Sequence, residues 1–251
     1  MVTKLGRLDL CIDVKNAKTS FEFYKKLGMK LVEGNPNEGW SVMESGNLRL
    51  GLYQDMSNYG KGGGATVSLN FRGGDVENIT KDIEALGYKF SKPFKAGKDG
   101  GGSSTVTDPN EVPVFFDTAP SEIGLLDKVT LDYAKTSSLG SCDVCFDTKK
   151  IAKTAKFYRE IGFEDVEGDE KEGWVILGHA NARIALFQGE SNNLTINFRG
   201  ANIIKLTDHL KNQGFKFETE YVVEDDGSKS SSLRDPDGYF IYFNTHPNEL
   251  N

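Results

Sequence analysis

The stretch 6-GRLDLCIDVKNAKTSFEFYKKLGMKLVEG-34 recurs later in the chain as 140-GSCDVCFDTKKIAKTAKFYREIGFEDVEG-168. The shared Gly, Asp, Cys, Phe-Tyr and Val-Glu-Gly lie at a constant offset of 143 − 9 = 134 residues. Farther along, 70-NFRG-73 matches 197-NFRG-200 at an offset of 197 − 70 = 127, so the first copy has a loop that is 134 − 127 = 7 residues longer. A repeat of this length predicts two homologous domains. We expect them at residues 1–118 and 138–251, with a linker over 119–137.

Each copy contains two units with the order βαβββ. In the first copy, the hydrophobic periodicity predicts one helix over 17–27, ending at Gly28, and a second over 75–86, ending at Gly87. Strands are expected near residues 8–14, 29–33, 39–44, 48–54, 65–72, 88–94, 103–107 and 112–117. One such unit covers only one face of its sheet with its helix, so the other face must curve around a partner unit or a ligand. The expected fold is α+β, with curved mixed sheets and helices on their outer faces.

The composition excludes several classes of protein. The chain of 251 residues has a formal net charge of −7 and no basic cluster, which argues against binding to nucleic acid or to an anionic membrane. No apolar run is long enough for a membrane span, and the first residues form a short alternating strand instead of a signal peptide. The three cysteines, Cys11, Cys142 and Cys145, are too few and too widely spaced for a disulfide framework, and Cys142 and Cys145 are expected to be buried and inert. We therefore expect a cytoplasmic protein.

Three features together resemble a known family. They are Phe23-Tyr24 followed by Leu27-Gly28, the paired βαβββ units, and the turn Asp235-Pro236-Asp237-Gly238 before the last strand. These features are similar to those of the vicinal oxygen chelate superfamily, which includes glyoxalase I, extradiol dioxygenases, fosfomycin-resistance enzymes and bleomycin-resistance proteins. The resemblance covers nearly the whole chain and implies two tandem glyoxalase-like domains. Activity has to be argued from the site, because one fold hosts many functions.

The resemblance also implies where a metal would be bound. Enzymes of this superfamily hold a divalent metal on the first, fourth, fifth and eighth strands of a domain, mostly with His and Glu. The corresponding positions here are Asp9, Gly51, Ser68 and Phe115 in the first domain, and Asp143, Ala185, Thr195 and Tyr242 in the second. One carboxylate among four positions cannot supply the three or four donors that a catalytic ion needs. His179, His209 and His246 show no metal-ligand spacing. We therefore predict no metal and no cofactor.

Strand alternation predicts which side chains face the concave sides of the sheets. If Asp9 faces inward, Cys11 and Asp13 do so too, while Leu8 and Leu10 cover the helix side. The candidate ligand-binding residues are Asp9, Arg49, Tyr53, Asn70, Arg72 and Phe115 in the first domain, and Asp143, Arg183, Phe187, Asn197, Arg199 and Tyr242 in the second. Rings with a few polar anchors are typical of sites for small organic molecules.

The same residues allow a structural interpretation. Asp9 can pair with Arg49 or Arg72 as a partly buried ion pair that only supports the fold. In the second domain, Asp143 can pair with Arg183 or Arg199 in the same way.

The sequence is therefore compatible with three functions. We expect a metal-independent protein of the bleomycin-resistance kind that binds a small organic molecule in its concave cavities. The first alternative is an enzyme of the superfamily, either a metalloenzyme or a metal-free lyase, isomerase or dioxygenase with Asp9 or Asp143 as a base. The second is an interaction module whose concave faces are filled by neighbouring side chains. We expect a monomer, because two joined domains can form within one chain the pair that single-domain relatives form as dimers.

Overall fold

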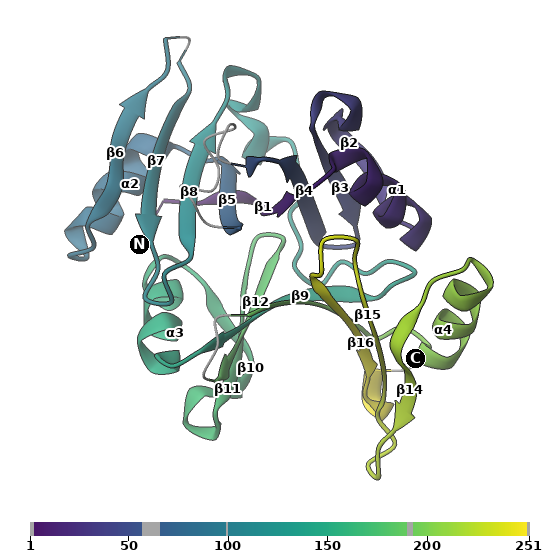
Figure 1. Ribbon diagram of the computed structural model, residues 1–251. Coiled ribbons are helices and arrows are strands. Elements are labelled where there is room, and N and C mark those ends of the chain that lie inside the picture. Colours follow the sequence, from purple (N-terminus) through teal and green to yellow (C-terminus); the bar gives the residue numbers. More distant parts are fainter. Residues whose placement is uncertain (1–2, 57–65, 99, 190–192, 250–251) are drawn as a thin grey trace.

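The structure of the protein, a computed structural model, describes residues 3–56, 66–98, 100–189 and 193–249. It contains two eight-stranded mixed sheets, one within residues 6–118 and the other within residues 141–245 (Figure 1). Each sheet is built from two βαβββ units in succession, so the predicted α+β fold is confirmed. The longer loop of the first copy lies mostly outside the described residues.

The elements follow the same order in all four units. The first sheet contains β1 (Gly6–Val14), α1 (Ala17–Leu27), β2 (Lys30–Asn35), β3 (Trp40–Ser45) and β4 (Leu48–Gln54), then β5 (Val67–Gly73), α2 (Val76–Ala85), β6 (Phe90–Ala96), β7 (Gly102–Thr107) and β8 (Pro113–Thr118). The second sheet contains β9 (Ser141–Thr148), α3 (Ile151–Glu160), β10 (Glu164–Asp169), β11 (Trp174–His179) and β12 (Ala182–Gln188), then β13 (Leu194–Arg199), α4 (Ile203–Asn212), β14 (Phe217–Val223), β15 (Lys229–Arg234) and β16 (Phe240–Thr245).

The two units of a sheet are joined through their first strands. In the first sheet the order is β2-β3-β4-β1-β5-β8-β7-β6, and the second sheet repeats this order as β10-β11-β12-β9-β13-β16-β15-β14. The central strands β1 and β5 are antiparallel to each other, and each pairs in parallel with the last strand of its own unit. The middle of each sheet is therefore made of the four strands on which the candidate site residues were predicted.

Local sequence signals set the ends of the helices. The side chain of Asn16 accepts a hydrogen bond of 2.9 Å from the backbone N–H of Thr19 and so caps α1. The helix ends at Gly28, whose φ of 111° is strained for residues with a Cβ. In β1, Leu8 and Leu10 are buried in the main core on the helix side, whereas Asp9 faces the opposite side. The alternation predicted for this strand is thus observed.

The two domains pack around a pseudo-two-fold axis. The ring of Phe23 on α1 lies 5.1 Å from the ring of Phe215, which follows α4. The equivalent rings are Phe157 (23 + 134) on α3 and Tyr88 (215 − 127) after α2, whose centroids are 5.0 Å apart. Figure 1 accordingly shows α1 on the same side of the molecule as α4, and α2 on the same side as α3. A single cluster of buried apolar side chains includes residues of both domains.

Two asparagines extend this symmetry to the backbone at the domain interface. Asn47 accepts a hydrogen bond of 2.7 Å from the backbone N–H of Cys142 and donates one of 2.9 Å to its carbonyl oxygen. The equivalent residue is Asn181 (47 + 134). It accepts a hydrogen bond of 2.8 Å from the backbone N–H of Leu8 and donates one of 2.9 Å to the carbonyl oxygen of Leu8. Both side chains are buried, so these bonds satisfy backbone groups that water cannot reach.

The first residues of the predicted linker pack against the first domain. The short helical turn Pro120–Glu122 has a counterpart, Pro247–Glu249 (120 + 127), at the end of the second domain. Glu122 is buried and forms ion pairs with Arg7 and Arg72 on the first sheet. We therefore propose that the first domain extends through Glu122, and that residues 123–137 form the connection.

None of the helices in the described ranges is long and apolar enough to cross a membrane. The three cysteines, all among the described residues, are buried and form no disulfide bond. Cys142 lies in the main core, whereas Cys145 packs with Ile176 and Ala185 on the other face of the second sheet. The two thiols therefore lie on opposite faces of β9, as expected for residues three apart in a strand.

Candidate functional site

Each sheet presents its concave face away from its helices. In the first sheet, Asp9 on β1 is opposite Asn70 on β5, which is opposite Phe115 on β8. We call this face the first cup. In the second sheet, the equivalent row is Asp143, Asn197 and Tyr242, and we call that face the second cup. The register brings together the central residues that the sequence predicted for each site.

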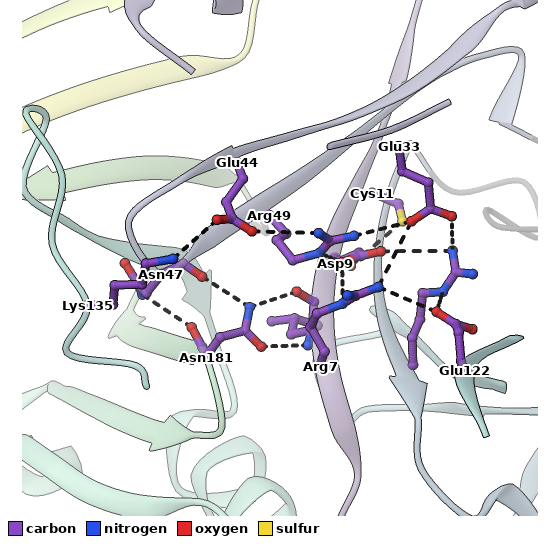
Figure 2. Close-up of polar contacts among 12 residues, drawn as sticks. Arg7, Asp9, Cys11, Glu33, Glu44, Asn47, Arg49, Glu122, Lys135 and Asn181 are labelled. Carbon is purple, nitrogen blue, oxygen red and sulfur yellow. Dashed lines mark hydrogen bonds and ion pairs between the residues drawn. The ribbon is translucent and has the colours of Figure 1, made fainter. Parts of the chain in front are cut away.

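The first cup contains a network of ion pairs (Figure 2). The Nε of Arg49 donates a hydrogen bond of 2.5 Å to Asp9, whose side chain is fully buried. Arg72 donates a hydrogen bond of 2.9 Å to Glu122, and it lies 3.5 Å from Glu33. The structural interpretation of Asp9 as an ion-pair partner therefore holds for this cup.

Arg7 is an additional cation in this network that the sequence did not single out. It lies on β1 two residues before Asp9, and its guanidinium is 3.4 Å from Glu122 and 3.9 Å from Asp9. Burial, together with the neighbouring Arg49, lowers the pKa of Arg7. Burial also opposes the charge of Arg49, but the contact with Asp9 outweighs it and raises the pKa of Arg49. The carboxylates of the first cup are thus used to neutralise arginines.

The two rings predicted for the first cup, Tyr53 and Phe115, are both buried. Tyr53 is 3% exposed and stacks on Trp40, with ring centroids 6.1 Å apart. Met56 packs with Cys11 and Tyr53 in the same cluster. Phe115 is 6% exposed and Asn70 is fully buried. The side chains predicted for this cup therefore lie close together and are mostly buried.

The second cup contains a cavity of about 820 Å³. Five of the six residues predicted for this domain line it: Asp143, Phe187, Asn197, Arg199 and Tyr242. Arg183 is not among the lining residues. It donates a hydrogen bond of 2.5 Å to Asp143 instead, so it positions and neutralises a carboxylate at the cavity wall.

Several residues that line the cavity were not among the predicted site residues. They are Glu167, Trp174, Asp226, Phe240 and His246. Glu167 and Trp174 belong to repeated motifs, since they match Glu33 and Trp40 at the offset of 134 (167 − 33 and 174 − 40), and that repetition was a usable signal. Asp226 comes from the β14–β15 turn and His246 follows the last strand, where strand alternation makes no prediction.

Arg199 is held by carboxylates on several sides. Its guanidinium lies 3.0 Å from Glu167, 2.7 Å from Glu249 and 3.5 Å from Asp143. Glu249 is the counterpart of Glu122 (122 + 127), so the second cup repeats the ion pairs of Arg72 in the first. Burial lowers the pKa of Arg199, but these carboxylates raise it overall.

The second cup also contains buried polar atoms without hydrogen-bond partners. They are Oδ2 of Asp143, Oδ1 of Asn197, Oδ1 of Asn244 and Nε of Arg199. All four residues line the cavity. Burial raises the pKa of Asp143, against the opposing effect of Arg183 and Arg199. Burial likewise raises the pKa of the Cys145 thiol, so this cysteine is not an activated nucleophile.

The residues at the expected metal positions do not fit a divalent cation. In the first cup, Asp9 shares those positions with Gly51, Ser68 and Phe115, and its carboxylate is bonded to Arg49. In the second cup, Asp143 has only Ala185, Thr195 and Tyr242 beside it at those positions. Among the described residues, no group of three or more His, Cys, Asp or Glu side chains is arranged to hold a metal ion. A dication would also be repelled by the arginines that already neutralise each aspartate.

The fold of the chain is similar to that of several solved structures. The Mn(II)-bound glyoxalase from Novosphingobium aromaticivorans is 14% identical, with a TM-score of 0.58 over 100% of this chain and 83% of the glyoxalase. A catechol 2,3-dioxygenase is 15% identical, with a TM-score of 0.58 over 100% of this chain and 91% of that protein. Homoprotocatechuate 2,3-dioxygenase from Arthrobacter globiformis is 16% identical, with a TM-score of 0.58 over 98% and 80% of the two chains. At these identities the likeness establishes the fold.

A family assignment comes from the sequence of the first domain. The sequence has no significant match among curated proteins. Residues 7–116 match the model of the Glyoxalase/Bleomycin resistance protein/Dioxygenase superfamily. The second domain repeats the first in sequence and in strand order. The first domain therefore belongs to the glyoxalase/bleomycin resistance protein/dioxygenase superfamily, and the second domain is its repeat in a chain with two tandem glyoxalase-like sheets.

Proposed function

We propose that this protein binds a small organic molecule in the second cup without the help of a metal ion. The observation that carries the proposal is the cavity of about 820 Å³, which combines aromatic rings with unpartnered polar atoms. Ligand sites of this size are typically apolar walls with a few polar groups that fix orientation. Buried polar atoms without partners are costly, and a bound ligand or ordered water would satisfy them.

Independence from metal is supported by the chemistry of the cup. Asp143 is the one carboxylate at the expected metal positions, and Arg183 already donates a hydrogen bond to it. A divalent ion would have to displace Arg183, and it would then find the side chains of Ala185 and Tyr242 where further donors are needed. The family's metal chemistry is therefore assigned no role in this protein.

Metal titration and ligand screening test the proposal. The expected result is that Mn(II), Fe(II) and Zn(II) leave the melting temperature of the chelator-treated protein unchanged, while some small aromatic or amphiphilic compounds raise it. Elemental analysis of protein purified without chelator should find no stoichiometric transition metal. A bound ion that disappears together with an activity would contradict the proposal, as would a broad compound screen without any stabilising ligand.

A second candidate function is a metal-free lyase or isomerase that uses Asp143 as a general base. It is favoured by the position of Asp143, whose Oδ2 lacks a hydrogen-bond partner at the cavity wall and whose pKa burial raises. The variant Asp143→Asn discriminates the two candidates. An enzyme of this kind loses turnover in the variant while ligand binding remains, whereas a binding protein has no turnover to lose.

We also propose that the protein is a cytoplasmic monomer. The domain pair is completed within one chain by the contacts of Phe23 with Phe215 and of Phe157 with Tyr88. The lack of disulfide bonds among the three cysteines fits a reducing compartment. Sedimentation equilibrium should give one species close to 27.7 kDa, and a concentration-dependent dimer would contradict the monomer.

A further inference from the structure

The charge around the cavity of the second cup is strongly negative. Among the described residues, four carboxylates and one arginine line the cavity: Asp143, Asp147, Glu167, Asp226 and Arg199. Adding the partners Glu249 and Arg183 gives five acidic and two basic groups, a sum of −5 + 2 = −3. An anionic ligand would meet this repulsion in a site with low dielectric walls, where charges interact more strongly than in water.

Arg199 does not offset this charge for an incoming anion. Its two terminal nitrogens face Glu167 at 3.0 Å and Glu249 at 2.7 Å, and one of them is also 3.5 Å from Asp143. An anion would have to compete with three carboxylates for one guanidinium. The arginine is therefore part of the wall of the cavity and not a ready anion site.

The buried cavity atoms that lack a hydrogen bond are mostly acceptors, although Oδ2 of Asp143 also lies 3.5 Å from the guanidinium of Arg199. The oxygen atoms are Oδ2 of Asp143 and Oδ1 of Asn197 and Asn244, against one donor, Nε of Arg199. Asp143 is 1% exposed and Asn197 is 8% exposed, so these oxygens are largely removed from bulk water. A ligand that donates hydrogen bonds complements this set.

The register places these acids beside aromatic rings. Across β16, β13 and β9, Tyr242 is opposite Asn197, which is opposite Asp143. Across β11, β12 and β9, a second row runs from Trp174 to Phe187 to Asp147. Phe187 is 37% exposed, in contrast to its counterpart Tyr53 (187 − 134) in the first cup, which is 3% exposed. The second row therefore places Phe187 directly beside Asp147, whereas in the first row Asn197 lies between Tyr242 and Asp143.

We propose that the second cup selects an organic cation with a flat apolar body and a nitrogen head group that donates hydrogen bonds. The head group would lie near Asp143 and Asn197, and the body would lie against the rings of Phe187 and Tyr242. Aromatic faces attract cations because of the ring quadrupole, and carboxylates near the rings add to that attraction. This inference rests on the proposed function of the second cup and specifies its ligand class.

Three probes with one ring system and different head groups test the ligand class. Naphthylmethylamine is a cation at pH 7, naphthylmethanol is neutral, and naphthoate is an anion. In calorimetric titrations of the full-length protein, the amine should bind at least about tenfold more tightly than the alcohol, and naphthoate should bind most weakly. The advantage of the amine should shrink when the salt concentration is raised from about 0.05 to about 0.5 M.

Matched variants assign the effect to the second cup. Asp147→Asn and Asp226→Asn should each weaken binding of the amine by about threefold to tenfold and leave binding of the alcohol unchanged. The control is Asp13→Asn, because Asp13 is the counterpart of Asp147 (147 − 134) in the first cup. Asp226 is on a turn, so its variant is informative even if Asp147→Asn fails to fold.

The possible outcomes separate this inference from the proposed function. If the alcohol or naphthoate binds as tightly as the amine, the inference is overturned while ligand binding by the cup stands. If none of the three probes binds, and screening finds no other ligand, both are overturned. Equal losses for the amine in Asp13→Asn and Asp147→Asn would also overturn the inference, because the charge effect would then not belong to the second cup.

Discussion

The phenol of Tyr24 donates a hydrogen bond of 2.8 Å to the carboxylate of Asp235 in the other domain. The same bond occurs at the equivalent place, where Tyr158 (24 + 134) donates 2.8 Å to Asp108 (235 − 127). Both tyrosines are fully buried, and burial raises the pKa of each phenol. The Phe-Tyr motif of each copy therefore meets the Asp-Pro turn of the other, and these two motifs hold the domain pair together.

We expect Tyr24→Phe to lower the free energy of unfolding by about 2 kcal/mol, since it removes a hydrogen bond to a buried carboxylate. Tyr158→Phe should have the same effect, and the two losses should add because the bonds share no partner. Urea denaturation followed by circular dichroism measures both. The control is Tyr221→Phe, because Tyr221 is 46% exposed and its variant should change the stability by less than about 0.5 kcal/mol. A loss no larger than in this control would show that the bond contributes little.

The stability should depend on pH through Asp108. Burial raises the pKa of its carboxyl from 3.8 to about 6, against the lowering effect of Tyr158 and two backbone N–H groups. Between these values the folded state binds more protons at Asp108 than the unfolded state does, so this contribution is present below about pH 4 and is lost as the pH rises through about 6. The loss is at most about 3 kcal/mol.

The variant Asp108→Asn isolates this effect. The difference in free energy of unfolding between the wild type and the variant should fall as the pH rises from about 4 to about 6. An NMR titration of the Asp108 side-chain carbon should show a midpoint near pH 6. If the midpoint lies at or below pH 4, the three hydrogen bonds outweigh desolvation and the predicted slope changes sign.

Removing one partner of the buried pair Asp9–Arg49 should be strongly destabilising. Arg49→Ala leaves the fully buried carboxylate of Asp9 without its closest cation, and we expect a loss of about 3 kcal/mol. The double variant Asp9→Asn/Arg49→Ala should recover part of that loss, because the uncompensated charge is gone. The exposed pair of Lys81 and Glu77 gives the comparison, since Lys81→Ala should change the stability far less than Arg49→Ala does. Similar losses in the two alanine variants would argue that Arg7 and Arg72 replace Arg49.

The sequence predicted the fold and the composition of each cup because both depend on regular periods. Alternation along β1 and β9, together with the repeat, was enough to place Asp9 and Asp143 on the concave faces and to bring the predicted rings beside them. What alternation could not predict is how far the described side chains of each cup are exposed, such as Tyr53 at 3% and Phe187 at 37%. That depends on the packing of side chains from irregular segments, such as Met56 in the first cup and His246 in the second. Alternation also could not predict the role of Arg183. This side chain points inward as expected, but it donates a hydrogen bond to Asp143 and does not line the cavity.

The difference between the cups gives a paired prediction for Phe187 and its counterpart Tyr53. Phe187 is 37% exposed in the cavity wall, so Phe187→Ala should cost little stability but weaken binding of naphthylmethylamine by about tenfold. Tyr53 is 3% exposed and packed on Trp40, so Tyr53→Ala should lower the free energy of unfolding by about 3 kcal/mol and leave binding unchanged. Denaturation and titration of both variants check the two effects separately. The reverse pattern, with binding lost only in Tyr53→Ala, would move the ligand site to the first cup.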